Sequence, residues 1–450
     1  MSNIRNYISF TFSCIGIFIL QSFAGLYLLT SFPLVLGMDL HLANYFSNMI
    51  AWCSIVGALS CLGAGVIMNN FSLNGGKAKP WLIWVSVPTS VFMCLIFFVP
   101  VDISTSSQLI YIAAAYTLYQ FGLSFILISR ASFIILMTDD HKTRSVLAWI
   151  SMLVISLLSI LPPNLFMPML NSTVHDYRVR IVFLMVFSSL FLMISGFLAQ
   201  ERSDKEKCQK EIQNVRKIGI LKQLKYVICN KYCLLLALIS LIGVIISISH
   251  AMSFLHYITY NIDSSLHILE EIIPLQTISG AVFVLLVVFI IRRFDALKLV
   301  IAGRIFSVLG LIICFFAGPQ SVALLFAGII VGKMGDGFIS VNASLSARLV
   351  EYIEWKHGVR QENLVSSILI SIGVIWGRLI TMVFTKWDLF AQAGTVEAET
   401  TVNLGKMSYY MYLAIPCALA AGVVILTLYF DLTEKKVDNM RVEIMRGTTK

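Results

Sequence analysis

The stretch Glu201-Arg202-Ser203-Asp204-Lys205-Glu206-Lys207-Cys208-Gln209-Lys210-Glu211 opens a charged and polar segment that continues to Cys229-Asn230-Lys231, near the middle of the 450-residue chain. The sequence on either side of this segment is almost wholly apolar. Counting outward, six hydrophobic runs precede it and six follow it. The sequence therefore predicts two units of similar size, over residues 1–200 and 232–450, joined by a central loop over residues 201–231.

The composition indicates that most of the surface faces lipid. Hydrophobic residues make up 58% of the chain and charged residues only 13%, whereas soluble domains are about a quarter charged. A helix of about 20 apolar residues spans a bilayer and satisfies its own backbone hydrogen bonds. Because the runs are long and do not alternate, they exclude a β-barrel. We expect an all-α membrane protein with twelve transmembrane helices.

The runs can be placed to within a few residues. Those of the first half cover roughly Ile8 to Leu36, Tyr45 to Asn69, Trp81 to Val101, Leu109 to Met137, Val146 to Phe166 and Ile181 to Ala199. Those of the second half cover roughly Tyr232 to Tyr257, Ile273 to Ile291, Leu299 to Phe316, Val322 to Leu345, Leu364 to Phe384 and Tyr409 to Phe430.

Positive charges predict the orientation. If both termini are cytoplasmic, 25 of the 33 Lys and Arg residues fall on that side and four on the other, as the positive-inside rule requires. The net charge of +9 then follows from topology, and it favours anionic lipid headgroups rather than nucleic acid as the partner. Two six-helix halves joined by a long loop are typical of the major facilitator superfamily, which binds substrate near the midplane between the halves. Other transporter folds also have twelve helices, so motifs in the short loops are needed to distinguish between them.

Four segments carry a specific resemblance. They are Gly76-Lys77-Ala78-Lys79-Pro80-Trp81-Leu82-Ile83-Trp84, the segment from Met137 to Leu147 with Thr138, Asp140 and Arg144, the segment Val350-Glu351-Tyr352-Ile353-Glu354-Trp355-Lys356-His357-Gly358-Val359-Arg360-Gln361-Glu362-Asn363-Leu364, and Leu432-Thr433-Glu434-Lys435-Lys436. Together, in this order, they resemble the loop signatures of the glycoside-pentoside-hexuronide:cation symporters, the group that includes melibiose and glucuronide permeases. Pro80 is expected in the first turn of the next helix, since proline is tolerated there.

The resemblance implies a secondary transporter of sugars or glycosides that works by alternating access in the bacterial inner membrane. We expect no cofactor, no resident metal, no nucleic-acid partner and a monomer. No loop combines a nucleophile, a base and an orienting group, so we do not expect an enzyme.

The family's cation site is not reproduced. Its two acidic residues on the second span fall at Gly57 and Cys61, neither of which can ligate a hard cation. The sugar-binding acids of spans one and four fall at Phe18 and Leu127, and the basic residue of span five falls near Ser151. Coupling to Na⁺ is therefore not expected, which leaves H⁺ or no coupling ion.

Charged residues inside the runs are the candidate replacements, because a charge at bilayer depth is costly and functional by default. Lys333 and Asp336 lie three residues apart on one face of span ten, as a structural ion pair or as part of the site. Arg378 on span eleven is expected either to pair with Asp336 or to point into the cavity, and Arg130 on span four either reaches the inner surface or lines the cavity. Arg304 is close enough to the surface to reach it and is set aside. We assign the coupling proton to Asp336.

The candidate substrate contacts combine these cations with polar groups inside the runs: Gln21, Gln120, Ser124, Arg130, Lys333 and Arg378. Bonding between helices is an equal alternative for the three uncharged residues. The surplus of cations favours an anionic sugar derivative such as a glucuronide.

Mixed charges in the loop motifs indicate a cytoplasmic gate. Its candidate residues are Lys77, Lys79, Asp140, Arg144, Glu351, Arg360 and Glu362. The alternative is a set of solvated loop ends, and in a wet loop each ion pair would be weak. Two further functions remain open: an uncoupled facilitator, and a non-transporting sensor or decayed paralogue that keeps only the scaffold.

Overall fold

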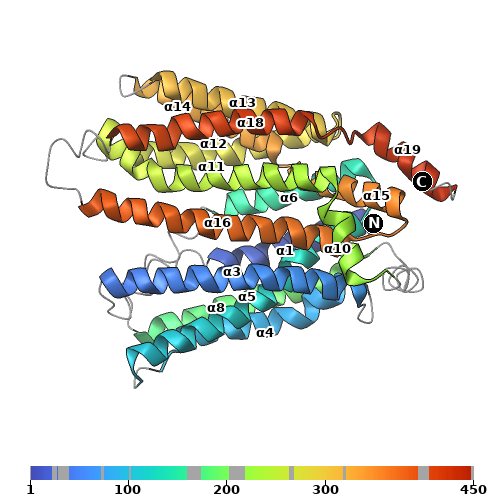
Figure 1. Ribbon diagram of the computed structural model, residues 1–450, viewed down its shortest axis with the longest axis horizontal. Helices are drawn as coiled ribbons and strands as arrows, with labels where there is room; N and C mark the ends of the chain where they lie inside the picture. The colour runs from blue at the N-terminus through green and yellow to red at the C-terminus, as the bar shows by residue number, and fades with distance from the viewer. Residues whose placement is uncertain are drawn as a thin grey trace.

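The computed structural model describes residues 2–22, 28, 40–71, 76–100, 103–159, 174–201, 218–262, 268–317, 321–393 and 405–446. Long helices that run roughly along one axis make up most of this part (Figure 1). The first helices are α1 (Ser2–Ser22), α3 (Leu40–Asn70), α4 (Lys79–Phe97), α5 (Thr105–Leu136), α6 (His141–Leu158) and α8 (Val174–Leu198).

The remaining helices follow the central segment or lie at its end. They are α10 (Ile220–Ile228), α11 (Lys231–Asn261), α12 (Leu269–Ile291), α13 (Ala296–Ala317), α14 (Val322–Ile339), α15 (Leu345–His357), α16 (Glu362–Ala393), α18 (Ile415–Leu428) and α19 (Glu434–Met445). A 3-10 turn, η3 (Asn342–Ser344), precedes α15, and a π-helical turn, η4 (Tyr410–Ala414), leads into α18.

Eleven helices in the described ranges are long and apolar enough to cross a membrane, which confirms the expected all-α, multi-pass fold. The predicted run from Val146 to Phe166 corresponds to α6, and residues 160–173 lie outside the described part. One boundary was wrong. The span that begins at Val322 continues through η3 and α15 to His357, so much of the motif expected to be a loop is helical.

Local sequence accounts for several helix ends. The side chains of Ser104, Asp140 and Asn230 each accept a hydrogen bond from a backbone N–H in the first turn of α5, α6 and α11, which satisfies a donor that has no partner within the helix. Pro80 occupies the first turn of α4 as expected. Gly358 has a φ of 70° and ends α15, a conformation that glycine adopts without steric cost.

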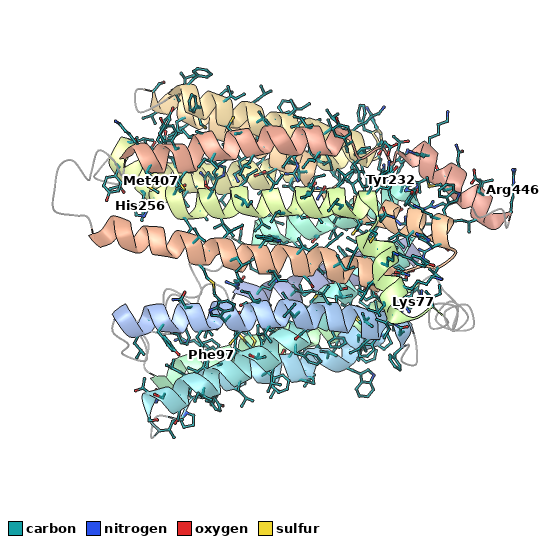
Figure 2. The ribbon with its side chains drawn as sticks, viewed as in Figure 1. Lys77, Phe97, Tyr232, His256, Met407 and Arg446 are labelled. Atoms are coloured by element: carbon teal, nitrogen blue, oxygen red, sulfur yellow. The ribbon has the colours of Figure 1, made fainter. Side chains whose placement is uncertain are left out.

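The spanning helices pack as two groups. The N-terminal group comprises α1 to α8, and the C-terminal group comprises α11 to α18; contacts across the boundary are made mainly by α3 with α16 and by α6 with α12. Both chain ends lie at one end of the bundle, here termed the termini face (Figure 1). The ribbons of α3 and α16 are close at this face and diverge toward the opposite end. Lys77 and Tyr232 lie toward the termini face, whereas His256 and Met407 lie at the far end (Figure 2).

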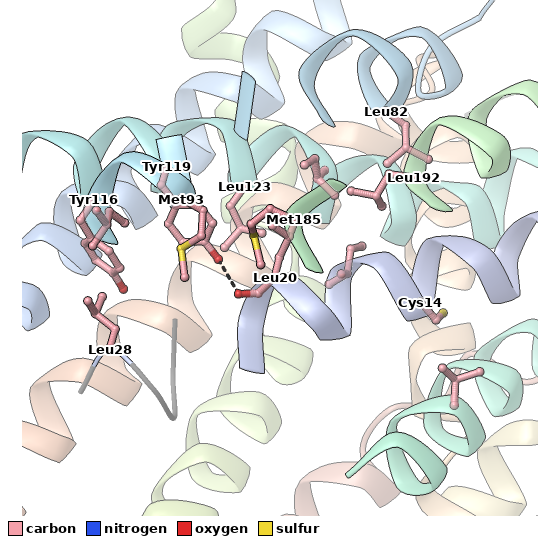
Figure 3. Close-up of a cluster of buried hydrophobic side chains, with 14 of the residues drawn as sticks. Cys14, Leu20, Leu28, Leu82, Met93, Tyr116, Tyr119, Leu123, Met185 and Leu192 are labelled. Carbon is pink, nitrogen blue, oxygen red and sulfur yellow. Dashed lines mark hydrogen bonds between the residues drawn. The ribbon is translucent and has the colours of Figure 1, made fainter. Parts of the chain in front are cut away.

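The side chains are arranged as a bilayer requires. Within the N-terminal group, Tyr116 and Tyr119 are fully buried, and the Tyr119 hydroxyl donates to the Leu20 carbonyl oxygen at 3.1 Å (Figure 3). Bonding of this kind satisfies a phenol away from water. By contrast, Trp84, Phe289 and Phe316 are at least 74% exposed, as expected for side chains that face lipid.

Candidate functional site

An ion pair between Lys77 and Glu362 joins the two groups of helices at the termini face. Lys77 precedes α4 in the N-terminal group, and Glu362 is the first residue of α16 in the C-terminal group. Lys77 Nζ lies 3.3 Å from Glu362 Oε2, and the two side chains are only 3% and 0% exposed. Glu362 also accepts from Arg360 Nε at 2.5 Å, and Arg360 reaches Glu354 at 3.2 Å. The Lys77 ammonium is thus held in a buried site by a carboxylate of the other group.

A second buried ion pair joins the groups at the same face. Arg144 of α6 donates from Nη1 to Glu351 Oε1 of α15 at 2.5 Å, with side-chain exposures of 1% and 2%. Arg441 of α19 contacts the same Glu351 oxygen. On its own side, Arg144 donates to the Thr138 carbonyl oxygen at 2.9 Å. One carboxylate therefore ties α6, α15 and α19 together.

These two pairs correct the expectation that the gate charges sit in a wet loop. All four partners are nearly inaccessible to water, so the attraction between them is screened little, and removing one partner leaves a buried charge without compensation. The predicted residues Lys77, Arg144, Glu351, Arg360 and Glu362 do come together, in two clusters.

Two predicted gate residues have other contacts. Asp140 accepts from the backbone N–H and the hydroxyl of Thr143, at 2.9 and 2.6 Å, and so caps α6. Burial alone would raise the pKa of Asp140, but these hydrogen bonds outweigh it and hold that pKa below its usual value. Lys79 contributes its backbone N–H, which donates to Glu201 at 2.6 Å.

Glu201 closes the loop before α4. Its carboxylate accepts three backbone N–H groups, from Lys77, Ala78 and Lys79, at 2.6 to 2.9 Å. Burial raises the pKa of Glu201, and the three hydrogen bonds oppose that rise. The start of the central segment thereby fixes the backbone that presents Lys77 to Glu362.

Close packing of α3 against α16 lies beneath the gate. The Asn363 amide donates to the Met68 carbonyl oxygen at 3.0 Å, and the Ser371 hydroxyl donates to the Ala58 carbonyl oxygen at 2.8 Å. Gly65 is required here, because an added Cβ would come within 2.0 Å of the Ser367 hydroxyl oxygen. The interface therefore continues along the helices below the ion pairs.

The two positions of the family's cation-binding acids are filled by helix packing. A Cβ on Gly57 would lie 2.6 Å from Gln120 Cβ, and Ser124 donates to the Gly57 carbonyl oxygen at 3.2 Å. Cys61 is 2% exposed, with its Sγ 3.9 Å from the Ser367 carbonyl oxygen. Within the described ranges, no three His, Cys, Asp or Glu side chains group as a metal site requires.

Within the described part of the chain, the polar candidates of the N-terminal group are either exposed or hydrogen-bonded to neighbouring groups. Gln21 is exposed near the end of α1. Gln120 donates to the Tyr116 hydroxyl at 2.6 Å, and Ser124 also donates to the Gln120 carbonyl oxygen at 2.8 Å. For Gln120 and Ser124, the alternative of bonding within and between helices is the one observed.

Arg130 points into the N-terminal group rather than along the helix to the surface. Its Nη1 donates to the Ser151 hydroxyl of α6 at 2.9 Å, while its Nε is buried without a hydrogen-bond partner among the described residues. Ser151 lies near the position where the resemblance places a basic residue. Arg130 of α5 therefore delivers a guanidinium to that position from a neighbouring helix.

Lys333 and Asp336 form the expected ion pair. Lys333 Nζ lies 3.0 Å from Asp336 Oδ2, and the side chains are 33% and 55% exposed. Of the two alternatives for Arg378, pairing with Asp336 is not observed among the described contacts. Arg378 is half-buried on α16.

A cavity of about 460 Å³ lies within the C-terminal group. Residues of α11, α12, α13, α14, η4 and α18 line it, and its polar side chains include His250, Gln276, Arg304, Lys333 and Asp336. Arg304 was wrongly set aside as a surface residue, and His250 and Gln276 were not singled out. The signal that could have found Arg304 is its place one helix before the Lys333–Asp336 pair, directly after Gly303.

The chain is similar to known transport proteins along most of its length. Residues 9–434 match the family described as "MFS/sugar transport protein". The chain is 22% identical over 423 residues to the glucuronide carrier protein homolog of Escherichia coli (strain K12), covering 93% of this chain and 91% of that protein. It is 23% identical over 313 residues to the isoprimeverose transporter of Lactiplantibacillus pentosus, covering 67% of this chain and 63% of that protein.

Solved structures share the fold at low sequence identity. The Escherichia coli fucose:proton symporter superposes with a TM-score of 0.66 at 12% identity, and the match covers 95% of this chain and 98% of that one.

Proposed function

The chain belongs to the MFS/sugar transport protein family, within its glycoside-pentoside-hexuronide branch, and from this premise we propose that it carries a sugar acid or related sugar derivative across the cytoplasmic membrane by alternating access. Family membership makes it a multi-pass membrane transporter of the sugar class. The identity of the solute, its coupling ion and the orientation in the membrane are part of the proposal.

The observation that carries the proposal is the closed termini face. Two buried ion pairs, Lys77 with Glu362 and Arg144 with Glu351, hold the N-terminal group against the C-terminal group there. The excess of Lys and Arg on that side indicates that it faces the cytoplasm. The protein is then in an outward-facing conformation, and breaking these pairs is the step that admits substrate to the cell interior.

Three features support an anionic substrate. The cations Arg130, Lys333 and Arg378 outnumber Asp336 among the predicted site residues. Arg130 places its guanidinium beside Ser151 without a carboxylate partner in the described part. A relative that matches nearly the whole chain is a glucuronide carrier homolog. A guanidinium binds a carboxylate strongly because the two can share charge-assisted hydrogen bonds.

Coupling to protons through Asp336 is the mechanism we favour over coupling to Na⁺. Gly57 and Cys61 offer no carboxylate oxygens where the family binds its cation, whereas Asp336 is an exposed carboxylate whose partner is Lys333. Protonation of Asp336 would free Lys333 for a substrate oxygen. Gln21, Gln120 and Ser124 remain candidate contacts for sugar hydroxyls.

The test is uptake of labelled glucuronide and of a labelled neutral galactoside into proteoliposomes, with a sodium gradient, a proton gradient or no gradient. Accumulation of the glucuronide with protons alone, lost in Arg130→Gln, is the expected result. Asp336→Asn should equilibrate the glucuronide without concentrating it. Equilibration in the wild type without any gradient would instead identify an uncoupled facilitator, and binding without flux would identify a non-transporting sensor.

A further inference from the structure

The cavity inside the C-terminal group is built from five spanning helices and the π-helical turn η4, and every residue that lines it follows the central segment. Its volume of about 460 Å³ lies in the range of small-molecule sites. A π-helical turn at the cavity wall is a further indication, because such turns occur frequently at functional sites.

The charges of the cavity do not balance. Lys333 and Asp336 compensate each other at 3.0 Å, which leaves the Arg304 guanidinium as an additional positive charge. Arg304 Nε is buried without a hydrogen-bond partner among the described residues. Burying a cation and its donors without full compensation is costly, so the cavity has room and unmet charge for one negative group.

A second buried nitrogen without a hydrogen-bond partner among the described residues belongs to the same cavity lining. His250 of α11 has a buried Nε2 without a hydrogen-bond partner in the part of the chain that the structure describes. Its ring lies 5.2 Å from the Tyr412 ring of η4, centroid to centroid. Gln276 of α12 adds an amide to the same lining. These groups can bond hydroxyls, and a tyrosine ring provides an apolar surface for the carbon face of a sugar.

Other occupants fit less well. A metal cation would meet two positive side chains and one carboxylate. A neutral sugar would leave the charge of Arg304 uncompensated. A dianion such as a phosphate monoester would exceed the single unmet charge. A monoanionic hydroxylated acid compensates Arg304 and uses the neutral donors and acceptors around it.

We infer that this cavity binds the acid group of the transported solute, with Arg304 as its principal anchor and His250 and Gln276 as contacts to the hydroxyl groups. The inference rests on the proposed function for the class of solute. It assigns the acid group to a cavity within the C-terminal group, and it leaves Arg130 of the other group as a contact to the rest of the solute.

The experiment measures binding of D-glucuronate, and of D-glucose as its uncharged counterpart, to the purified full-length protein by isothermal titration calorimetry. Arg304→Gln should weaken glucuronate binding at least tenfold, and His250→Gln should weaken it by a smaller factor. Arg293→Gln, which removes an exposed cation between α12 and α13, should bind glucuronate as the wild type does. Thermal denaturation of each variant, compared with the wild type, shows whether it is folded.

The outcomes separate this inference from the proposed function. Unchanged glucuronate affinity in a folded Arg304→Gln protein, or no binding of glucuronate by the wild type, would overturn the inference, while sugar uptake by proteoliposomes would still support transport. Glucuronate binding that depends on Arg304 but occurs without flux of any sugar would support the site and contradict the transport.

Discussion

Glu362 serves two cations at once, because it binds Lys77 of the N-terminal group and Arg360 of its own group in a site that excludes water. In such a site each charged side chain depends on its own partner, because water cannot take the partner's place. A buried ammonium that loses its carboxylate destabilises the surrounding structure by about 3–5 kcal/mol. Only the state in which the termini face is closed suffers this loss, because water reaches Lys77 once the two groups separate.

Glu362→Gln should therefore favour the state that is open at the termini face. The native reporter is Cys61, which lies between α3 and α16 with 2% of its surface exposed. In a chain that keeps Cys61 as its single cysteine, we expect Glu362→Gln to speed maleimide labelling by about tenfold or more, since 1.4 kcal/mol corresponds to a factor of ten. Glu362→Asp, which keeps a carboxylate for both Lys77 and Arg360, should label more slowly than Glu362→Gln. Equal rates in the wild type and Glu362→Gln would show that this pair does not hold the face closed.

Individual residues were predictable where a motif located them. Lys77, Arg144, Glu351, Arg360 and Glu362 were predicted from loop segments whose order is fixed by the chain, and the structure brings them together in two clusters. Their role as a gate stays a prediction. The burial of these side chains could not be predicted, because it depends on how α15, α16 and α19 pack over them. Arg304 was missed because depth along a helix says nothing of the direction in which the side chain points, and this direction is set by how α13 packs on α14.

The pair α13 and α14 is the closest helix contact of the C-terminal group. A Cβ on Gly310 would lie 2.5 Å from the Gly332 backbone nitrogen and 2.7 Å from the Gly328 carbonyl oxygen. Backbone atoms cannot move aside as a flexible side chain would, so the two helices would have to separate. This contact also forms one wall of the cavity.

Gly310→Ala should thus lower the thermal stability of the protein, by about 1–3 kcal/mol as for other overpacked sites. The matched control is Gly422→Ala on α18, where an added Cβ meets no atom within 4 Å. Both changes bring the same gain in helix propensity, so the difference in apparent melting temperature in detergent isolates the steric effect. Equal melting temperatures would contradict the tight contact.

The C-terminal helix α19 contacts both groups of spanning helices. His141 Nε2 of α6 lies 3.1 Å from Asp438 Oδ1, and Arg441 contacts Glu351. Trp355 Nε1 donates to Glu443 at 2.6 Å. By these contacts α19 spans the closed termini face.

The docking of α19 should weaken in mild acid. Burial lowers the pKa of His141, the cations Arg441, Arg144 and Arg348 lower it further, and Glu351 opposes them. The docked state therefore favours neutral His141. Docking is complete above about pH 6.5, the ordinary histidine pKa, and it is lost progressively as the pH falls from there toward the lowered pKa of the docked state.

A spin label at the exposed Asn439 reports this change. Its mobility should rise between pH 7.5 and pH 5.5 in the wild type, and His141→Gln should remove most of that rise. A rise of equal size in His141→Gln would show that another group controls the docking.

At the scale of elements, the apolar runs predicted the spanning helices well, because lipid imposes the same length and composition on each of them. The predicted run ended at Leu345, whereas the helical span continues to His357. This extension was missed because its last turns are charged, and charged residues after an apolar run predict a loop. The π-helical turn at Tyr410 to Ala414 leaves no pattern in the apolar composition, since it changes the hydrogen bonding and not the residue type.

For the whole molecule, the resemblance in the loops predicted the family, and the matching family confirms it. The division at residues 201–231 remains a prediction in its boundaries, since residues 202–217 lie outside the described part. The conformation was not predictable, because the same sequence must populate both states of a transport cycle and only packing selects the one observed.

The central claim is that the termini face is a gate whose opening moves the two groups apart. The most direct measurement is the distance between spin labels at Lys142 in the N-terminal group and Lys356 in the C-terminal group, both exposed at this face, by double electron–electron resonance in lipid. The account predicts a short distance in the wild type and a longer population that grows with glucuronide and dominates in Glu362→Gln. A single short distance, unaffected by glucuronide and by Glu362→Gln, would contradict it.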